Sequence, residues 1–132
     1  MVPRVDMVMI DYQWDFATTL RFVLDAGYSR IPVFLGTQDV IKGILYIKDC
    51  LPYTTAGADF DWHTLIRPAN FVPENKKIDD LLEEFRSEHR HISIVVDEYG
   101  GTSGLITLED ILEEIVGEIT DEYDEDELPY TR

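Results

Sequence analysis

The sequence predicts an α/β (α+β) fold in which two β-α-β-β-α repeats pack about a pseudo-twofold axis. One indication is a recurring segment: GILYIKD at residues 43–49 and GLITLED at residues 104–110 both place an aspartate six residues after a glycine. A shift of 61 residues superimposes Arg30, Ile31, Gly43 and Asp49 on His91, Ile92, Gly104 and Asp110. Upstream the best shift is 62, which predicts a one-residue difference in the loop before the strand at residue 30. Two such copies can cover each other's remaining apolar sheet faces.

The first repeat, with its connector, is predicted to span residues 1–64. Asp15 can cap a helix, and RIPVFL at 30–35 and GILYI at 43–47 have the branched residues of strands. The apolar face of this helix is expected to carry Phe16, Leu20, Val23 and Leu24. Proline, glycine and a loss of periodicity predict that residues 51–64 are a connector.

The second repeat is predicted to span residues 65–120. Asn75 is expected to begin a helix, HISIVVD at 91–97 and GLIT at 104–107 are expected strands, and Gly100 and Gly101 can take positive φ in the turn between them. The helix after Asn75 carries Ile78, Leu81, Leu82 and Phe85. The last helix has an apolar face formed by Leu108, Ile111, Leu112, Ile115, Val116 and Ile119. Residues 121–132 are predicted to be an acidic tail or linker.

Composition excludes several classes of function. The 132 residues hold 27 acidic and 11 basic side chains, and the formal charge of −16 would repel a nucleic acid. No apolar run approaches the roughly 18 residues of a membrane span, and no secretory signal is recognisable. The lone Cys50 excludes an internal disulfide and is interpreted as a small apolar residue in a reducing compartment. We therefore expect one compact cytoplasmic domain.

Thr107 and Asp110 lie where the last strand is expected to pass into a helix. Thr-x-x-Asp is typical of a capping box, in which each side chain accepts a hydrogen bond from the other residue's backbone. The same residues suit a nucleotide, because the helix N-terminus attracts phosphate and a carboxylate can accept from both ribose hydroxyls. Both roles can coexist. In the first repeat Tyr46 replaces the threonine, so Asp49 is either a first-turn acid favoured by the helix dipole or a remnant of a second ligand site.

The sequence offers no catalytic apparatus. It contains no defensible Ser-His-Asp or Cys-His arrangement and no Gly-x-x-x-x-Gly-Lys phosphate loop. His89 and His91 have no third metal ligand placed nearby, and the acidic tail lacks the glycine of a calcium loop. Binding without turnover is therefore expected, and the chain is not predicted to be an enzyme.

The repeats resemble a tandem of cystathionine-beta-synthase (CBS) domains, often called a Bateman module. MVPRVDM, GYSRIPVF, LIRPANFVPE and VDEYGGTSGLITLEDILEEIVGEI closely resemble the CBS pair of the CorC, haemolysin-like magnesium and cobalt efflux family and its cyclin M relatives. The resemblance implies a regulatory module that binds an adenosine nucleotide (ATP, ADP or AMP) in a cleft between the repeats. It also implies a homodimer of CBS pairs, attached to the membrane only through domains absent from this chain, at the cytoplasmic face.

The resemblance also implies roles for individual residues. Thr107 would contact phosphate, Asp110 the ribose and Leu105 the base. The strand-entry contacts would be Tyr28, Ser29, Arg30 and Pro32, with Arg30 as phosphate partner, and the backbone around Val5 and Asp6 would meet the adenine. Glu109 is a candidate contact for a magnesium ion carried by the nucleotide, because Mg²⁺ bridges phosphates to carboxylates.

The sister cleft is expected to differ, since Tyr46 replaces the hydroxyl residue and His91 is aligned with Arg30. One occupied site per chain is therefore predicted. The alternative function is a ligand-free dimerisation scaffold whose clefts are filled by side chains such as Tyr46. Hydrolysis of the nucleotide is a less favoured third possibility.

Overall fold

The computed structural model describes residues 1–122, with side chains as far as Val116. It contains two successive β-α-β-β-α units, as predicted. The first unit consists of β2 (Ile10–Asp11), α1 (Phe16–Ala26), β3 (Arg30–Leu35), β4 (Thr37–Tyr46) and α2 (Ile47–Cys50). The second consists of β5 (Phe71–Pro73), α3 (Ile78–Ser87), β6 (Ile92–Val96), β7 (Thr102–Thr107) and α4 (Leu108–Glu122). Short elements outside these units are β1 (Val2–Pro3) and the 3₁₀ helices at Arg4–Asp6, Leu51–Tyr53 and Trp62–Leu65.

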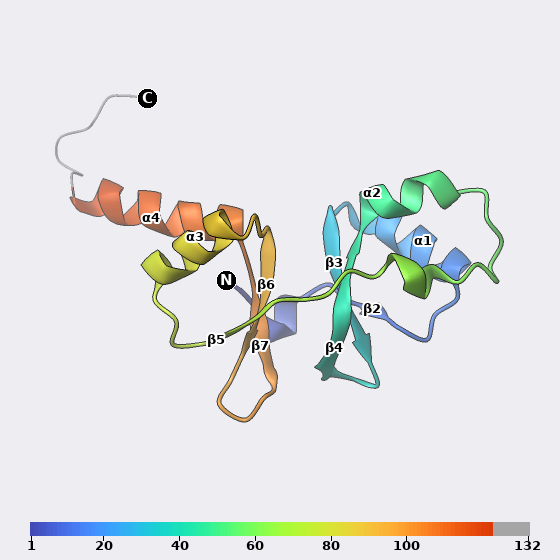
Figure 1. The fold of residues 1–132 in the computed structure, drawn as a ribbon, viewed down its shortest axis with the longest axis horizontal. Helices are drawn as coiled ribbons and strands as arrows, with labels where there is room; N and C mark the ends of the chain where they lie inside the picture. The colour runs from blue at the N-terminus through green and yellow to red at the C-terminus, as the bar shows by residue number, and fades with distance from the viewer. Residues whose placement is uncertain (123–132) are drawn as a thin grey trace.

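The two units form separate sheets with the same local plan. One sheet has the order β2-β3-β4 and the other β1-β7-β6-β5. In each unit a parallel pair is followed by an antiparallel hairpin with an irregularity in register. Figure 1 shows the sheets near the middle of the molecule, with α1 and α2 at one end and α3 and α4 at the other.

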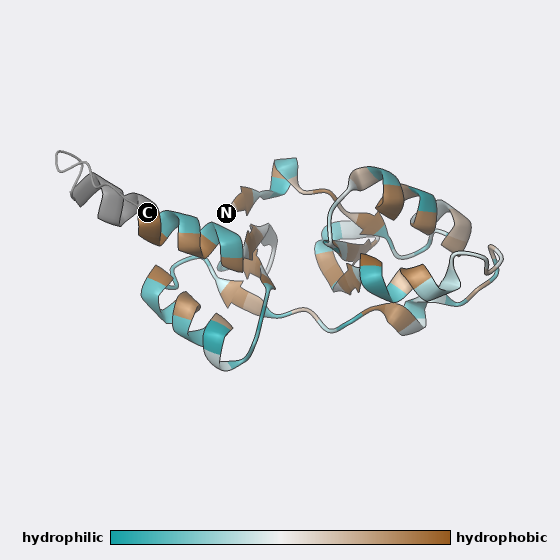
Figure 2. Cartoon of the chain, turned by 90° about the horizontal axis from the view of Figure 1, so that it is seen from above, coloured by the Kyte–Doolittle hydropathy of each residue, from teal (hydrophilic) through white to brown (hydrophobic). Residues whose placement is uncertain are grey.

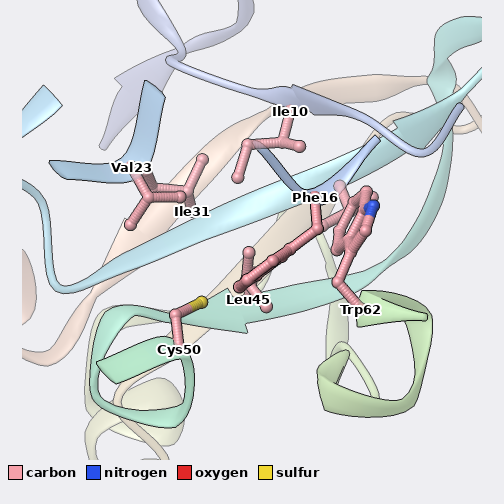
Figure 3. Close-up of a cluster of buried hydrophobic side chains, with 8 residues drawn as sticks. Ile10, Phe16, Val23, Ile31, Leu45, Cys50 and Trp62 are labelled. Atoms are coloured by element: carbon pink, nitrogen blue, oxygen red, sulfur yellow. The ribbon is translucent and has the colours of Figure 1, made fainter. Parts of the chain in front are cut away.

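Three clusters of buried side chains hold this arrangement together. Two lie within single units, between a sheet and its helices. The first, drawn in Figure 3, contains Ile10, Phe16, Val23, Ile31, Val33, Leu45, Cys50 and Trp62. The second contains Val72, Leu81, Phe85, Val95, Ile106 and Ile111. The third joins the units and contains Met7, Met9, Ile44, Ile92, Ile94 and Leu105. The faces that the units' own helices leave uncovered are thus buried against each other, as predicted.

Residues 51–64, predicted as a connector, are packed against the first unit. Trp62 is only 2% exposed and belongs to the same cluster as Phe16. Its indole Nε1–H donates to the carbonyl oxygen of Trp14 at 2.8 Å. Without this bond the N–H group would be buried with no hydrogen-bond partner. The chain crosses to the second unit only after this, near residues 66–70 (Figure 1, yellow-green). Figure 2 shows this crossing and that of the N-terminal segment as two separate connections.

Several details of the helices and the turn differ from expectation. Asp15 caps α1 as predicted, accepting from the Thr18 N–H at 2.8 Å. However, α3 begins after Lys77, not Asn75, and Lys77 makes no side-chain cap. In the β6–β7 turn Gly100 has positive φ but Gly101 does not. Three residues predicted on apolar helix faces are largely exposed: Leu24, Leu112 and Val116. Ile119 and the whole of the predicted acidic tail, residues 121–132, lie outside the described side chains.

The repeated glycine has a steric cause. A Cβ on Gly43 would lie 2.4 Å from the carbonyl oxygen of Arg67, and one on Gly104 would lie 2.2 Å from that of Val2. Each distance is far below contact, and each neighbour belongs to a segment that crosses between the units. Arg67 bridges Ile44 of the first sheet, while β1 pairs with β7 of the second. Each crossing segment can therefore lie against a hairpin only because that hairpin has a glycine there.

Strand register corrects the alignment of the repeats. Ile10 pairs with Val33 as Val72 pairs with Val95, so the 62-residue shift extends through β3. The N–H of Ile47 donates to the Ser29 carbonyl, and the equivalent bond in the second unit joins Leu108 to His91. The counterpart of Ser29 is thus His91, and that of Arg30 is Ile92 rather than His91. The one-residue difference lies in the hairpin after β3, not in the loop before it.

The N-terminal segment and the two hairpins meet at Asp39. Its Oδ1 accepts from Nη1 of Arg4 at 2.6 Å and from the backbone N–H of Thr102 at 3.0 Å. Arg4 also donates to Gln38. A single carboxylate of the first hairpin therefore links the start of the chain to the second hairpin.

Replacing Trp62 by alanine is expected to destabilise the protein by about 3–5 kcal/mol, the usual cost of emptying a buried aromatic site. Leu51→Ala is the matched control in the same stretch, because Leu51 is 52% exposed. Urea denaturation of both variants measures the difference. Equal unfolding midpoints would show that residues 51–64 are not part of the first core.

Gly104→Ala is expected to lower the free energy of unfolding by about 1–3 kcal/mol, because the added methyl overlaps the Val2 carbonyl. The control is Gly57→Ala, where a Cβ meets only the movable Asp59 side chain at 3.0 Å, and a change within about 0.5 kcal/mol is expected. If denaturation gives both variants the same stability, close approach of β1 does not explain the glycine.

Candidate functional site

A cavity of about 300 Å³ lies between the two units, and we call it the main cleft. Its walls come from the N-terminal segment, the entry to β3, the start of β6, and the junction of β7 with α4. The lining residues are Val2, Asp6, Met7, Val8, Tyr28, Ser29, Arg30, Ile31, Pro32, Ile92, Leu105, Thr107 and Asp110. Of the nucleotide contacts that the resemblance implied, those from Asp6 to Asp110 are all among them, although they are up to 104 positions apart in the sequence.

Thr107 and Asp110 form the predicted capping box at the start of α4. The Asp110 N–H donates to Oγ1 of Thr107 at 3.1 Å, and the Thr107 N–H donates to Oδ2 of Asp110 at 3.3 Å. Both side chains are half-buried and line the main cleft. The hydroxyl hydrogen of Thr107 and the second oxygen of Asp110 take no part in these bonds. A donor and an acceptor thus remain for a ligand at a helix N-terminus.

Arg30 lies at the wall shared with a neighbouring cavity. Its Nε is buried and has no hydrogen-bond partner among the described residues, and its guanidinium carbon lies 5.4 Å from the centre of the Tyr46 ring. An unsatisfied buried donor is costly unless a ligand or water accepts from it. Nearby Pro32 is fully buried and forms a fixed wall, whereas Tyr28 is 55% exposed and can adjust to a ligand.

Two predicted contacts lie apart from this lining. Val5 does not line the cavity and is 88% exposed. Glu109 is also exposed and absent from the lining. Sequence reasoning missed five apolar wall residues: Val2, Met7, Val8, Ile31 and Ile92. Met7 and Val8 belong to the apolar run MVMI at residues 7–10, which was the available signal for their part of the wall.

A second cavity of about 350 Å³ occupies the sister position, and we call it the second cleft. Its lining residues are Ser29, Arg30, Tyr46, Ile47, Lys48, Arg67, His89 and His91. Ser29 and Arg30 also line the main cleft, so the two cavities adjoin. Tyr46 takes the place that Thr107 has in the second unit, as predicted. Unlike Thr107 it makes no side-chain cap.

Asp49 has a partner that neither sequence interpretation anticipated. Although it lies in the first turn of α2, its carboxylate forms a bidentate ion pair with Arg67, with N···O distances of 2.8 and 3.0 Å. These hydrogen bonds lower the pKa of Asp49 and raise the pKa of Arg67. The pair fixes the crossing segment against α2. It occupies the carboxylate that a second ribose site would need.

Other chemistry is limited in the part of the chain that the structure describes. It holds no group of three or more His, Cys, Asp or Glu side chains able to ligate a metal. None of its helices has the length and apolarity of a membrane span. Burial raises the pKa of the Cys50 thiol to about 11, which makes it a poor nucleophile, in line with the apolar role expected for it.

Comparison with known proteins gives consistent relatives. The CBS domain family matches residues 62–117. The magnesium and cobalt efflux protein CorC of Vibrio cholerae is 50% identical over 96% of this chain and 44% of its own, and that of Escherichia coli is 45% identical over the same shares. The chain thus spans less than half the length of these relatives.

Solved structures agree with the sequence relatives. A CBS domain of the bacterial CNNM/CorC family Mg²⁺ transporter in complex with ATP is 43% identical, with a TM-score of 0.82, over 89% of this chain and 84% of that one. A CBS-domain pair with bound AMP from Klebsiella pneumoniae is 32% identical, with a TM-score of 0.79, over 89% and 94%.

Asp49→Asn is expected to reduce stability at neutral pH by about 0.2–1 kcal/mol, the range for partly exposed ion pairs. Because the folded pKa of Asp49 is lowered, the pair stabilises the fold above the unfolded value of about 3.9, and this contribution is lost as the pH falls below it. Denaturation of the unmodified chain and of Asp49→Asn should show a smaller difference in free energy of unfolding at pH 3 than at pH 7. Asp59→Asn is the control, because Asp59 is exposed and forms no ion pair within the described residues. If this difference is the same at both pH values, the Asp49–Arg67 ion pair is not its cause.

Proposed function

Because this chain belongs to the CBS domains of the CNNM/CorC family, we propose that it binds an adenosine nucleotide in the main cleft without turning it over. The observation that carries the proposal is the convergence of Thr107, Asp110 and Arg30 on one cavity between the units. Bound ATP and AMP in the two similar structures support the ligand class.

The geometry supports a division of roles around the nucleotide. Asp110 accepts from the ribose hydroxyls, while the Thr107 hydroxyl donates to a phosphate at the N-terminus of α4. Arg30 offers its Nε, which has no acceptor within the described residues, to the phosphates. Leu105 and the apolar walls receive the adenine, with Tyr28, Ser29 and Pro32 at the strand entry.

The contact between the N-terminal segment and the adenine differs from the one implied by the resemblance. Its contact with the adenine runs through the backbone at Asp6 and the side chains of Met7 and Val8, with Val5 pointing to solvent. A magnesium ion would be held chiefly by nucleotide phosphates and water, because Mg²⁺ keeps several waters. Glu109, exposed beside Asp110, would reach such an ion only from outside the cavity.

Binding at this place would act on the arrangement of the units. A ligand that contacts both units stabilises the arrangement in which they are closest, and that difference in affinity can be passed to attached domains. We assign the chain a regulatory role within a magnesium and cobalt transport protein, at its cytoplasmic side. The exposed Leu112 and Val116 of α4 offer a surface for a second copy, which supports a homodimer.

ATP, ADP or AMP is expected to raise the melting temperature of the chain, because a ligand that binds only the folded state stabilises it.

Asp110→Ala should weaken nucleotide affinity at least tenfold in calorimetry, since it removes hydrogen bonds between the ribose hydroxyls and a charged group. Its cost in stability should stay near 1 kcal/mol, the value of a lost cap.

Asp79→Ala, an exposed first-turn aspartate of α3, is the control. Unchanged affinity in Asp110→Ala refutes the ribose role. The absence of any thermal shift in the unmodified chain favours the ligand-free scaffold, and release of phosphate from ATP would identify a hydrolase.

A further inference from the structure

We propose that the second cleft is a phosphate-binding site that extends the main cleft. Its ligand is a phosphate-bearing anion, and the nearest source is the distal phosphates of a nucleotide whose adenosine lies in the main cleft. This form of the inference rests on the proposed function. It predicts that Lys48, Arg67, His89 and His91 select nucleotides by the number of their phosphates.

Charge is the first observation. The chain has 27 acidic and 11 basic residues, yet among the side chains described, those of residues 1–116, no carboxylate lines the second cleft. Its eight lining residues include three permanent cations, Arg30, Lys48 and Arg67, and two histidines that donate N–H groups. A cavity whose charged side chains are cations attracts anions locally, even though the net charge of the chain is negative.

The cations converge on one aromatic ring. The guanidinium carbon of Arg67 lies 4.1 Å from the centre of the Tyr46 ring, that of Arg30 lies 5.4 Å away, and Nζ of Lys48 lies 5.9 Å away. The ring's negative face offsets part of their mutual repulsion. An anion among them would offset the rest.

Within residues 1–116, two of these cations have no partner of opposite charge. Asp49 holds Arg67, but among the described residues neither Arg30 nor Lys48 forms an ion pair. The Nε of Arg30 is moreover buried, and no side chain or backbone group in the described part of the chain accepts from it. Arg30 thus offers a donor group at the boundary of both cavities, where a phosphate chain leaving the ribose would pass.

His89 supplies an independent sign. It is the single non-glycine with positive φ, at 56°, among the residues that the structure describes. Helix ends favour glycine in this conformation, and other residues adopt it at some cost. The side chain of His89, which a glycine would lack, lines the second cleft together with that of His91.

Calorimetry with ATP, ADP and AMP on the whole chain tests the proposal. The unmodified chain should bind ATP more tightly than AMP. Lys48→Gln and His91→Gln, both at exposed positions, should weaken ATP about tenfold, which corresponds to one charge-assisted hydrogen bond, and leave AMP within about twofold.

The matched control is Lys42→Gln. Lys42 is also exposed and lies on β4, the strand that leads into the helix of Lys48. Its Nζ is likewise within 6 Å of a tyrosine ring, at 5.6 Å from the centre of that of Tyr12, but Lys42 does not line the second cleft. An ATP affinity in Lys48→Gln equal to that in Lys42→Gln overturns the proposal.

His89→Gly separates ligand binding from structure. Glycine suits the positive φ, so the melting temperature should hold or rise while ATP affinity falls. A variant that keeps full ATP affinity would show that His89 serves only as a helix end.

Pyrophosphate as a second probe distinguishes the sources. If it binds in the presence of AMP and this binding is lost in Lys48→Gln, the site accepts a free anion. If only ATP and ADP respond to the substitution, the anion is the nucleotide's own tail. Equal binding of AMP and ATP with no response to either substitution overturns the inference and leaves the proposed function intact. Failure of every adenosine nucleotide to bind removes the proposed function, and pyrophosphate then tests the site alone.

Discussion

Mutual burial of the two sheets is the contact on which the rest of the molecule depends. Each small sheet has one face covered by its own helices and one that only the other unit can cover. Met7, Ile44, Ile92 and Leu105 meet in that shared layer, each nearly excluded from water. Burying a side chain of this size contributes about 1.5–3 kcal/mol, so the pairing is strongly favoured. Because the sheets meet face to face, a cavity at their edges is necessarily lined from both units.

The crossing segments make this pairing specific. Each unit's hairpin accepts a strand-like segment at a glycine, β1 at Gly104 and Arg67 at Gly43. The same segments then enter the cavities, since β1 leads into Asp6 and Met7 of the main cleft while Arg67 lines the second. The glycine that recurs in the sequence is therefore a requirement of the joint between units. The glycine affects the ligand site only indirectly, by letting these segments reach the cavities.

Sequence reasoning succeeded where the determining interactions are local or repeated. The capping box joins Thr107 to Asp110, three positions later. The placement of Arg30 near it came from the resemblance to the CBS family. Sequence reasoning failed where the interacting residues are far apart in the sequence and neither belongs to a recognisable motif. The Asp49–Arg67 pair spans 18 positions, and Trp62 fills a core from within a stretch that lacks periodicity. The alignment of Arg30 with His91 erred because a one-residue insertion can be placed on either side of a strand until pairing registers are known.

The corrected register explains why the two clefts differ despite their common plan. The main cleft combines the strand entry of the first unit with the helix entry of the second, Ser29 and Arg30 with Thr107. The second cleft makes the reciprocal combination, and there Tyr46 and His91 occupy the equivalent places. One cleft therefore keeps a hydroxyl and a free carboxylate oxygen, whereas the other keeps an aromatic wall among cations. Charges separated by more than about 8 Å are largely screened at physiological salt, so this local difference, and not the net charge of −16, decides what each cleft attracts.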